Sequence, residues 1–169
     1  MKTILLAAGL VGLALSTHAQ KPSLRALDEK NGFRDVQFGS DSSALTGRVL
    51  ETHKANTYTY SRPADNKQIG SASVRFISYT YYKGRLSTVA IMAKGAANAR
   101  ALKDALEAQY QYGIPENQYS KHYYWQTKRV KMSYEINPVT DDGVLYIFGR
   151  EVIEQQRKDE QAAARKADL

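Results

Sequence analysis

Two runs of strand-forming residues meet at Lys83 and Gly84, and this junction limits the fold more than any other part of the chain. Residues 73–82 and 85–93 are rich in Tyr, Val, Ile and Thr, which favour extended backbone. Only two residues separate the runs, and a glycine that takes a positive φ lets such a short connection form a tight hairpin turn. We therefore expect an antiparallel sheet built around this hairpin.

The turn also sets an expected register for the hairpin. Counting outward from it places Tyr81 opposite Leu86 and Tyr79 opposite Thr88. One face of the hairpin then carries Ile77, Tyr79, Tyr81, Leu86, Ala90 and Met92. The other face is also apolar and carries Val74, Phe76, Val89 and Ile91. Two explanations stay open: the base of the hairpin is covered on both sides, or a β-bulge shifts the register.

The order of the predicted elements indicates the fold class. Five further stretches favour strands, at residues 33–39, 57–62, 121–126, 129–136 and 144–149. With the helices described below, the order is one strand, then a helix and three strands twice over, then a C-terminal helix. This order predicts an α+β fold with an antiparallel sheet and helices on one face, built as a duplicated αβββ unit. A two-layer arrangement of another topology is the alternative.

Apolar residues at helical spacing predict a long helix over residues 97–112. Its apolar stripe consists of Ala99, Leu102, Leu106 and Tyr110. The tail from about Val152 has almost no large apolar side chain, so we expect a polar C-terminal helix that projects into solvent or frays.

A shorter helix is predicted over residues 42–51, where Leu45 and Val49 lie at i and i+4. Ser40 and Asp41 precede it, and both residue types accept hydrogen bonds from the free N–H groups of a first helical turn.

The first 19 residues have the three-part pattern of a secretory signal peptide. Lys2 gives the positive start, residues 4–15 are apolar, and cleavage is expected after Ala19. The apolar run is shorter than the about 20 residues that span a bilayer. We therefore expect a periplasmic or secreted protein without stable membrane insertion. It would comprise one domain over residues 20–150 and a polar helix or tail over residues 151–169.

The charge of the chain bears on its partners. The formal net charge is +7 at pH 7, and the positive residues are scattered rather than gathered in one block. Such a charge attracts anionic partners, but a charge of this size can also do no more than keep a protein soluble. An anionic glycan or an envelope protein is the expected kind of partner, and nucleic acid is not expected.

The second predicted hairpin presents the candidate ligand face. A two-residue turn at residues 127–128 sets Trp125 opposite Val130 and Tyr123 opposite Met132, in the core. The other face carries His122, Tyr124, Gln126, Arg129, Lys131, Ser133 and Glu135. Such a face is ordinarily just solvated. If the chain binds an anionic ligand, the expected contact residues are His122, Tyr124, Arg129 and Lys131.

Motifs for catalysis, metals and cofactors are missing from the sequence. It contains no cysteine and no glycine-rich phosphate loop. His53 and His122, the histidines outside the signal segment, lie in no recognisable motif. Acids that a carboxylate mechanism would need are present, but their spacing does not bring two together: Asp35, Asp41, Glu51 and Asp65. We therefore predict no catalytic residue, no metal and no cofactor.

Two stretches carry a resemblance to known proteins. Residues 31–39, and the run of Tyr123, Tyr124 and Trp125 before Val130, Met132 and Tyr134, resemble small exported bacterial proteins of uncharacterised function. In element order the chain is also similar to tandem αβββ modules of periplasmic assembly lipoproteins and secreted enzyme inhibitors, although it lacks a lipoprotein cysteine.

The resemblance transfers no catalytic residue. It favours a non-enzymatic exported binding or interaction module. An inhibitor of a secreted hydrolase is the alternative, and a carboxylate-dependent enzyme is a less favoured one.

Overall fold

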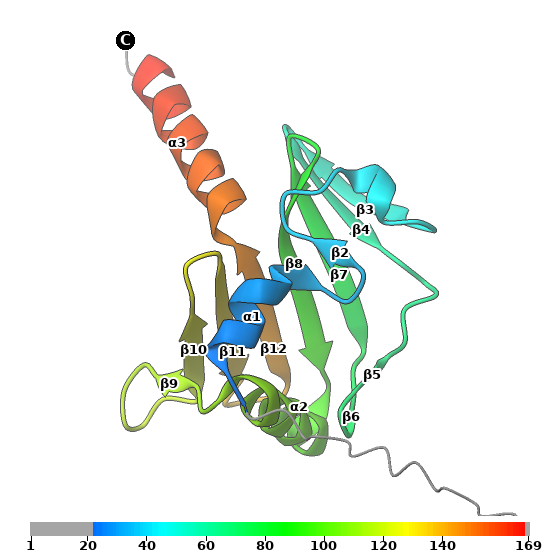
Figure 1. Ribbon diagram of the computed structural model, residues 1–169, viewed down its shortest axis with the longest axis vertical. Helices are drawn as coiled ribbons and strands as arrows, with labels where there is room; N and C mark the ends of the chain where they lie inside the picture. The colour runs from blue at the N-terminus through cyan, green and yellow to red at the C-terminus, as the bar shows by residue number, and fades with distance from the viewer. Residues whose placement is uncertain (1–21, 168–169) are drawn as a thin grey trace, which may run out of the picture.

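The structure, a computed structural model, describes residues 22–167 (Figure 1). Its main feature is an antiparallel sheet of eight strands. In spatial order these are β3 (Val49–Lys54), β4 (Thr57–Ser61), β7 (Phe76–Tyr82), β8 (Arg85–Ala93), β12 (Gly143–Gly149), β11 (Val130–Ile136), β10 (His122–Gln126) and β9 (Ile114–Pro115). Two short pairs lie outside it, β1 (Gly32–Phe33) with β2 (Val36–Gln37) and β5 (Gln68–Ile69) with β6 (Ala72–Ser73). The predicted α+β class is confirmed.

Strands β7 and β8 form the hairpin that the sequence predicts. Lys83 and Gly84 have φ angles of 48° and 79°, so both residues of the turn are in the left-handed region. Turns of this kind match the twist of the flanking strands. Tyr81 lies opposite Leu86, as expected.

A β-bulge then changes the register of this hairpin. Tyr79 faces Val89 and not Thr88, because the pairing shifts by one residue next to the turn. Ser87 is the extra residue: it is buried, and its hydroxyl donates a hydrogen bond to the carbonyl of Thr80 at 2.9 Å. Of the two explanations for the apolar residues on both faces of this hairpin, the β-bulge is therefore the correct one. The apolar residues of β8 that face the core are Leu86, Val89 and Ile91, whereas Ala90 and Met92 point to the other side.

The β10–β11 hairpin keeps its predicted faces but not its predicted register. The N–H of Thr127 donates to the carbonyl of Val130 at 2.8 Å, so the turn falls at residues 128–129. The observed pairs are Tyr123 with Tyr134, Trp125 with Met132 and Gln126 with Lys131. This corrects the predicted pairing by two residues. Side chains alternate with a period of two along a strand, so the shift leaves the residues of both strands on their predicted faces.

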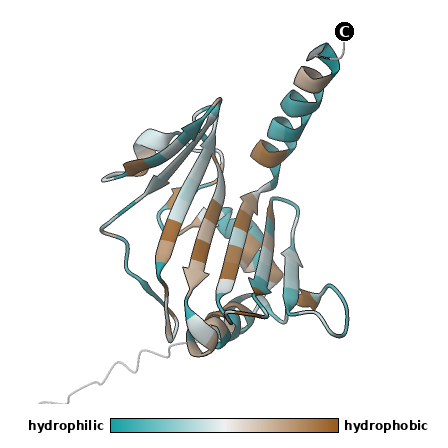
Figure 2. Ribbon diagram, turned by 180° about the vertical axis from the view of Figure 1, so that it is seen from behind, coloured by the Kyte–Doolittle hydropathy of each residue, from teal (hydrophilic) through white to brown (hydrophobic). Residues whose placement is uncertain are grey.

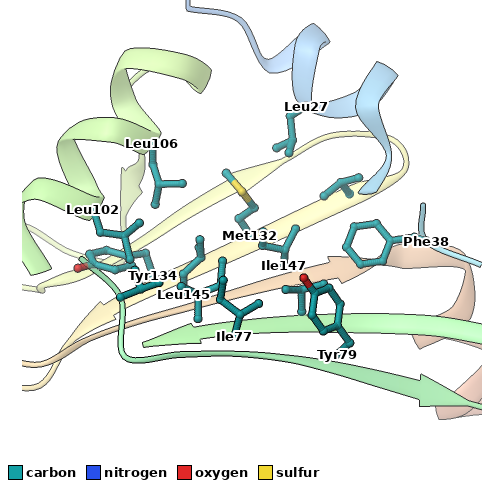
Figure 3. Close-up of a cluster of buried hydrophobic side chains, with 14 of the residues drawn as sticks. Leu27, Phe38, Ile77, Tyr79, Leu102, Leu106, Met132, Tyr134, Leu145 and Ile147 are labelled. Carbon is teal, nitrogen blue, oxygen red and sulfur yellow. The ribbon is translucent and has the colours of Figure 1, made fainter. Parts of the chain in front are cut away.

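Helices α1 (Leu24–Lys30) and α2 (Gly95–Tyr110) pack on one side of the sheet, which we call the inner face (Figure 1). Leu27, Leu102 and Leu106 point from these helices towards Met132 and the other strand residues of the core (Figure 3). All four residues of the predicted stripe on α2 are buried: Ala99, Leu102, Leu106 and Tyr110. Helices on one face of the sheet are therefore confirmed.

The predicted helix over residues 42–51 is wrong. Only a 3₁₀ turn forms, η1 (Ser42–Ala44), and Asp41 caps it by accepting a hydrogen bond from the N–H of Ser43 at 2.8 Å. Gly47, with a φ of 71°, then interrupts any helix, and the chain continues as the edge strand β3. Leu45 is fully buried, so its apolar character reflects packing beneath a loop and not a helical stripe.

Helix α3 (Arg150–Ala167) follows directly from β12 and extends beyond the end of the sheet (Figure 1). Its first half is more closely attached than the predicted projecting tail. Val152 is buried, and the Asp159 carboxylate accepts hydrogen bonds from the hydroxyl of Tyr82 at 2.8 Å and the ammonium of Lys83 at 2.7 Å. Among residues 22–167, no helix combines the length and the apolar content needed to cross a membrane.

The two halves of the sheet share one arrangement. Strands β4, β7 and β8 form one three-stranded meander, β10, β11 and β12 form the other, and β8 pairs with β12 between them. Helix α2 leads into the second meander, which gives one αβββ unit. The first meander lacks an equivalent helix directly before it, because β3 takes that place in the chain.

Candidate functional site

The side of the sheet opposite α1 and α2 is left open over most of its strands, and we call it the outer face (Figure 2). Among the described helices only α3 borders it, where Ile153 and Glu154 lie beside Lys131 and Phe148. The strand registers arrange its side chains in three rows. The middle row consists of Ile114, Tyr124, Ser133, Tyr146, Ala90 and Ser78. On one side of it, the lysine row consists of Gln126, Lys131, Phe148, Thr88 and Thr80. On the other, the glutamate row consists of His122, Glu135, Val144, Met92 and Phe76.

Aromatic side chains are exposed on the outer face, and charges are sparse. Tyr146 and Phe76 are 43% and 39% exposed. The ring of Tyr146 stacks beside that of Phe148, with centroids 6.0 Å apart. Lys131 and Glu135 are the only permanently charged residues of the three rows. Aromatic enrichment and charge depletion are typical of the centre of an interface, so the outer face is the strongest candidate surface in the described part of the chain.

His122, at one end of the glutamate row, has contacts at both ring nitrogens. Nε2 lies 2.7 Å from the Ser133 hydroxyl oxygen, and Nδ1 lies 3.0 Å from the Tyr124 hydroxyl oxygen. A carboxylate oxygen of Glu116 is 3.6 Å from the same Nδ1. A hydroxyl beside an imidazole that is itself close to a carboxylate is the beginning of a nucleophile, base and acid arrangement.

This cluster lacks a place for an oxyanion. Ser133 lies in the middle of β11, between β10 and β12, so the backbone N–H groups around it belong to the sheet ladders. Acyl transfer needs free N–H donors aimed at the developing oxyanion. The chemistry that the cluster can supply to a ligand is therefore hydrogen bonding and ring stacking.

Three of the four residues predicted to contact an anion lie together on the outer face. His122 and Tyr124 have ring centroids 4.4 Å apart, and the ammonium nitrogen of Lys131 lies 5.3 Å from the centroid of the Tyr124 ring. Glu135 is the direct cross-strand neighbour of His122. Acidic side chains thus lie at the His122 end of the predicted contact surface, and Lys131 is the only lysine or arginine of the three rows.

Arg129 lies elsewhere, which corrects its predicted place on this face. It occupies the hairpin turn because the register is shifted, and it contacts the end of α1. Its N–H donates to the Asp28 carboxylate at 2.7 Å, and its guanidinium donates to the carbonyls of Asp28 and, at 3.2 Å, of Glu29. The guanidinium therefore fastens α1 to the sheet.

Two of the four acids considered for a carboxylate mechanism do converge, on Arg62. Its guanidinium donates to both oxygens of Asp35 at 2.7 Å and to Asp65 at 3.0 Å. The hydroxyl of Tyr79 donates to Asp65 at 2.7 Å, and Arg34 donates to the same carboxylate at 2.8 Å. The Asp65 side chain is 1% exposed. Each carboxylate is occupied by an ion pair, so the cluster ties the covering segments to the sheet.

The remaining acids and the second histidine have local structural roles. Asp41 caps η1, and Glu51 accepts a hydrogen bond from the hydroxyl of Ser61. His53 stacks on Tyr58, with ring centroids 4.1 Å apart. Within residues 22–167, no three His, Asp or Glu side chains are grouped as a metal site would require.

The Arg62–Asp35 pair gives a prediction for acid conditions. Hydrogen bonds from Arg62 hold the pKa of Asp35 below its ordinary value. A depressed folded-state pKa contributes stability that is present above the unfolded pKa, about 4, and is lost as pH falls through the folded pKa. We expect urea midpoints of wild type and Asp35→Asn to differ at pH 7 and to converge towards pH 3. A constant difference over this range would contradict the role given to the Asp35 carboxylate.

Sequence reasoning missed the outer-face contribution of Phe76, Met92, Tyr146 and Phe148. For the last two, the alternation along residues 144–149 was a usable signal, since every second residue of that strand must face away from the core.

Comparison of the chain with protein-family models, curated proteins and solved structures gives no match.

Proposed function

We propose that the chain is a non-enzymatic, exported interaction module that binds a protein partner through its outer face. One observation carries this proposal: α1 and α2 cover one side of the eight-stranded sheet, whereas the other side is met only at its end by α3 and exposes aromatic residues such as Tyr146 and Phe76. A soluble domain usually covers or charges such a surface unless it serves binding.

The size and composition of the outer face favour a protein over an anionic glycan. Five strands spaced about 4.8 Å apart, each presenting about 20 Å of its length, form a surface of roughly 25 Å by 20 Å, with the short β9 at its edge. One partner in a standard protein interface contributes about 800 Å² of accessible surface, a comparable scale. The single lysine of the three rows, Lys131, is a weak basis for recognising a polyanion, which depends on several cations.

Export supplies the setting for this binding, and the signal segment gives a direct test. Residues 1–19 lie outside the described residues, so this part of the proposal rests on the sequence pattern. Mass spectrometry of the protein recovered from its natural source should find Gln20 at the N-terminus, as glutamine or pyroglutamate. Recovery of the uncleaved chain from Met1 in the membrane fraction would contradict export by cleavage.

The binding surface is tested by crosslinking in living cells. A photoreactive phenylalanine analogue is placed at Tyr146 or Phe76 on the outer face, and at Arg100, an exposed position on α2, as the control. We expect discrete protein adducts from the two outer-face positions, and their loss when Ser133→Arg is added to block the surface. Adducts to polysaccharide, or equal protein adducts from Arg100, would contradict the proposal. A hydrolase as the adduct would favour the alternative function, an inhibitor of a secreted hydrolase.

A further inference from the structure

The three rows of the outer face are complementary to themselves when they are reversed. The lysine row and the glutamate row flank the middle row at equal distances, two residues away along each strand. We infer that the protein partner of the outer face is a second copy of this chain, packed sheet against sheet about a two-fold axis along the middle row. This rests on the proposed use of the outer face for protein binding.

The charges supply the first argument for a second copy. Lys131 and Glu135 lie four residues apart on β11, about 13 Å, which is too far for a salt bridge within one chain. Rotation about the middle row lays β11 antiparallel over its own copy, with Ser133 at the axis. Lys131 then faces Glu135 of the second copy, and the same contact recurs by symmetry. The only two permanent charges of the three rows thereby neutralise each other.

The uncharged residues supply the second argument. The same rotation sets Phe148 over Val144 of the second copy, and Phe76 over Thr80 of the second copy. The axis carries both small and large residues of the middle row: Ser78, Ala90 and Ser133 leave space into which the rings of Tyr124 and Tyr146 can turn as two sheets approach the about 10 Å spacing of face-to-face packing. Packed sheets hold their strands within about 30° of each other, so the contacts align best over β11 and β12, at the centre of the face.

The area of the outer face meets the lower limit for association. A face of roughly 25 Å by 20 Å projects about 500 Å² from each copy, and the total of about 1,000 Å² is at the lower end for a specific interface, as expected of a reversible dimer. Homodimer interfaces are more apolar than other protein interfaces, and the exposed Phe76 and Tyr146 fit that composition.

Sedimentation velocity of the purified protein over about 1 to 100 μM tests the inference, since this range brackets micromolar association. We expect a reversible monomer–dimer equilibrium for the wild type. Lys131→Glu places like charges face to face twice, and Glu135→Lys does the same, so each should weaken dimerisation by about tenfold or more. The double variant, with both charges exchanged, restores the attraction and should return to within about threefold of wild type. Arg100→Glu, the same charge change on α2, should leave the equilibrium unchanged.

Rescue by the double variant is the decisive result, because two charges that do not face each other cannot compensate. A wild-type protein that stays monomeric at about 100 μM, well above the micromolar range, would overturn the inference. So would single variants that dimerise like wild type, or a double variant as weak as the singles. If the protein is monomeric while crosslinking from Tyr146 still yields another protein, the outer face binds a different partner and only this inference fails.

Discussion

Replacing Asp65 by Asn should lower the free energy of unfolding by about 3 kcal/mol, the low end for a buried ion pair that loses one partner, because Arg62 then keeps only the exposed Asp35 as its carboxylate. The Arg62 side chain is only 11% exposed, and Asp65 is the buried member of its two carboxylate partners. The same change weakens the hydrogen-bond acceptor of the Tyr79 hydroxyl. Burial raises the pKa of this hydroxyl, so it stays protonated and remains a donor. Urea unfolding at pH 7, followed by the fluorescence of the buried Trp125, measures the effect.

Asp35→Asn is the matched control for this prediction. The Asp35 side chain is 58% exposed, so its pair with Arg62 is screened by solvent and its loss should cost about 1 kcal/mol. Equal losses for the two variants, or an Asp65→Asn protein that unfolds at the wild-type urea concentration, would show that burial of the charge does not set the cost.

Truncation of Leu106 to Ala should cost about 2 to 5 kcal/mol, the range for a large aliphatic side chain removed from a packed core. Leu106 is 5% exposed on α2 and points at the inner face of the sheet beside Leu102 (Figure 3). The same urea titration measures the loss. Ala97→Ser, at an exposed position of the same helix, should cost about 0.5 kcal/mol through helix propensity alone. A Leu106→Ala protein as stable as the Ala97→Ser protein would mean that α2 does not cover the sheet as described.

Much of the fold could be predicted because its signals are local. The stripe on α2 repeats over about three turns, and the turn at Lys83 and Gly84 fixes where the β7–β8 hairpin closes. The predicted strand registers were wrong where a single residue decides the pairing. Nothing in the sequence distinguishes the bulge at Ser87 from a regular ladder, and Leu45 and Val49 are too few to distinguish a helix from a loop followed by an edge strand.

The candidate site was predicted in part for the same reason. Alternation along β10 and β11 placed His122, Tyr124 and Lys131 on one surface without any knowledge of the register. Arg129 was predicted on the wrong surface because a residue in a turn does not follow the inner–outer alternation of a strand. The convergence of Asp35 and Asp65 on Arg62 joins segments far apart in the chain, and spacing carries no information on contacts of that range.

The most direct test of the central claim, one covered and one free side of the sheet, uses two methionines. Met132 is fully buried on the inner face, whereas Met92 lies in the glutamate row of the outer face. Dilute peroxide should oxidise Met92 quickly and Met132 slowly in dilute protein, as peptide mass spectrometry can measure. Raising the protein concentration should slow Met92 alone, because a partner then covers the outer face. Equal oxidation rates for the two methionines in dilute, folded protein would contradict the account.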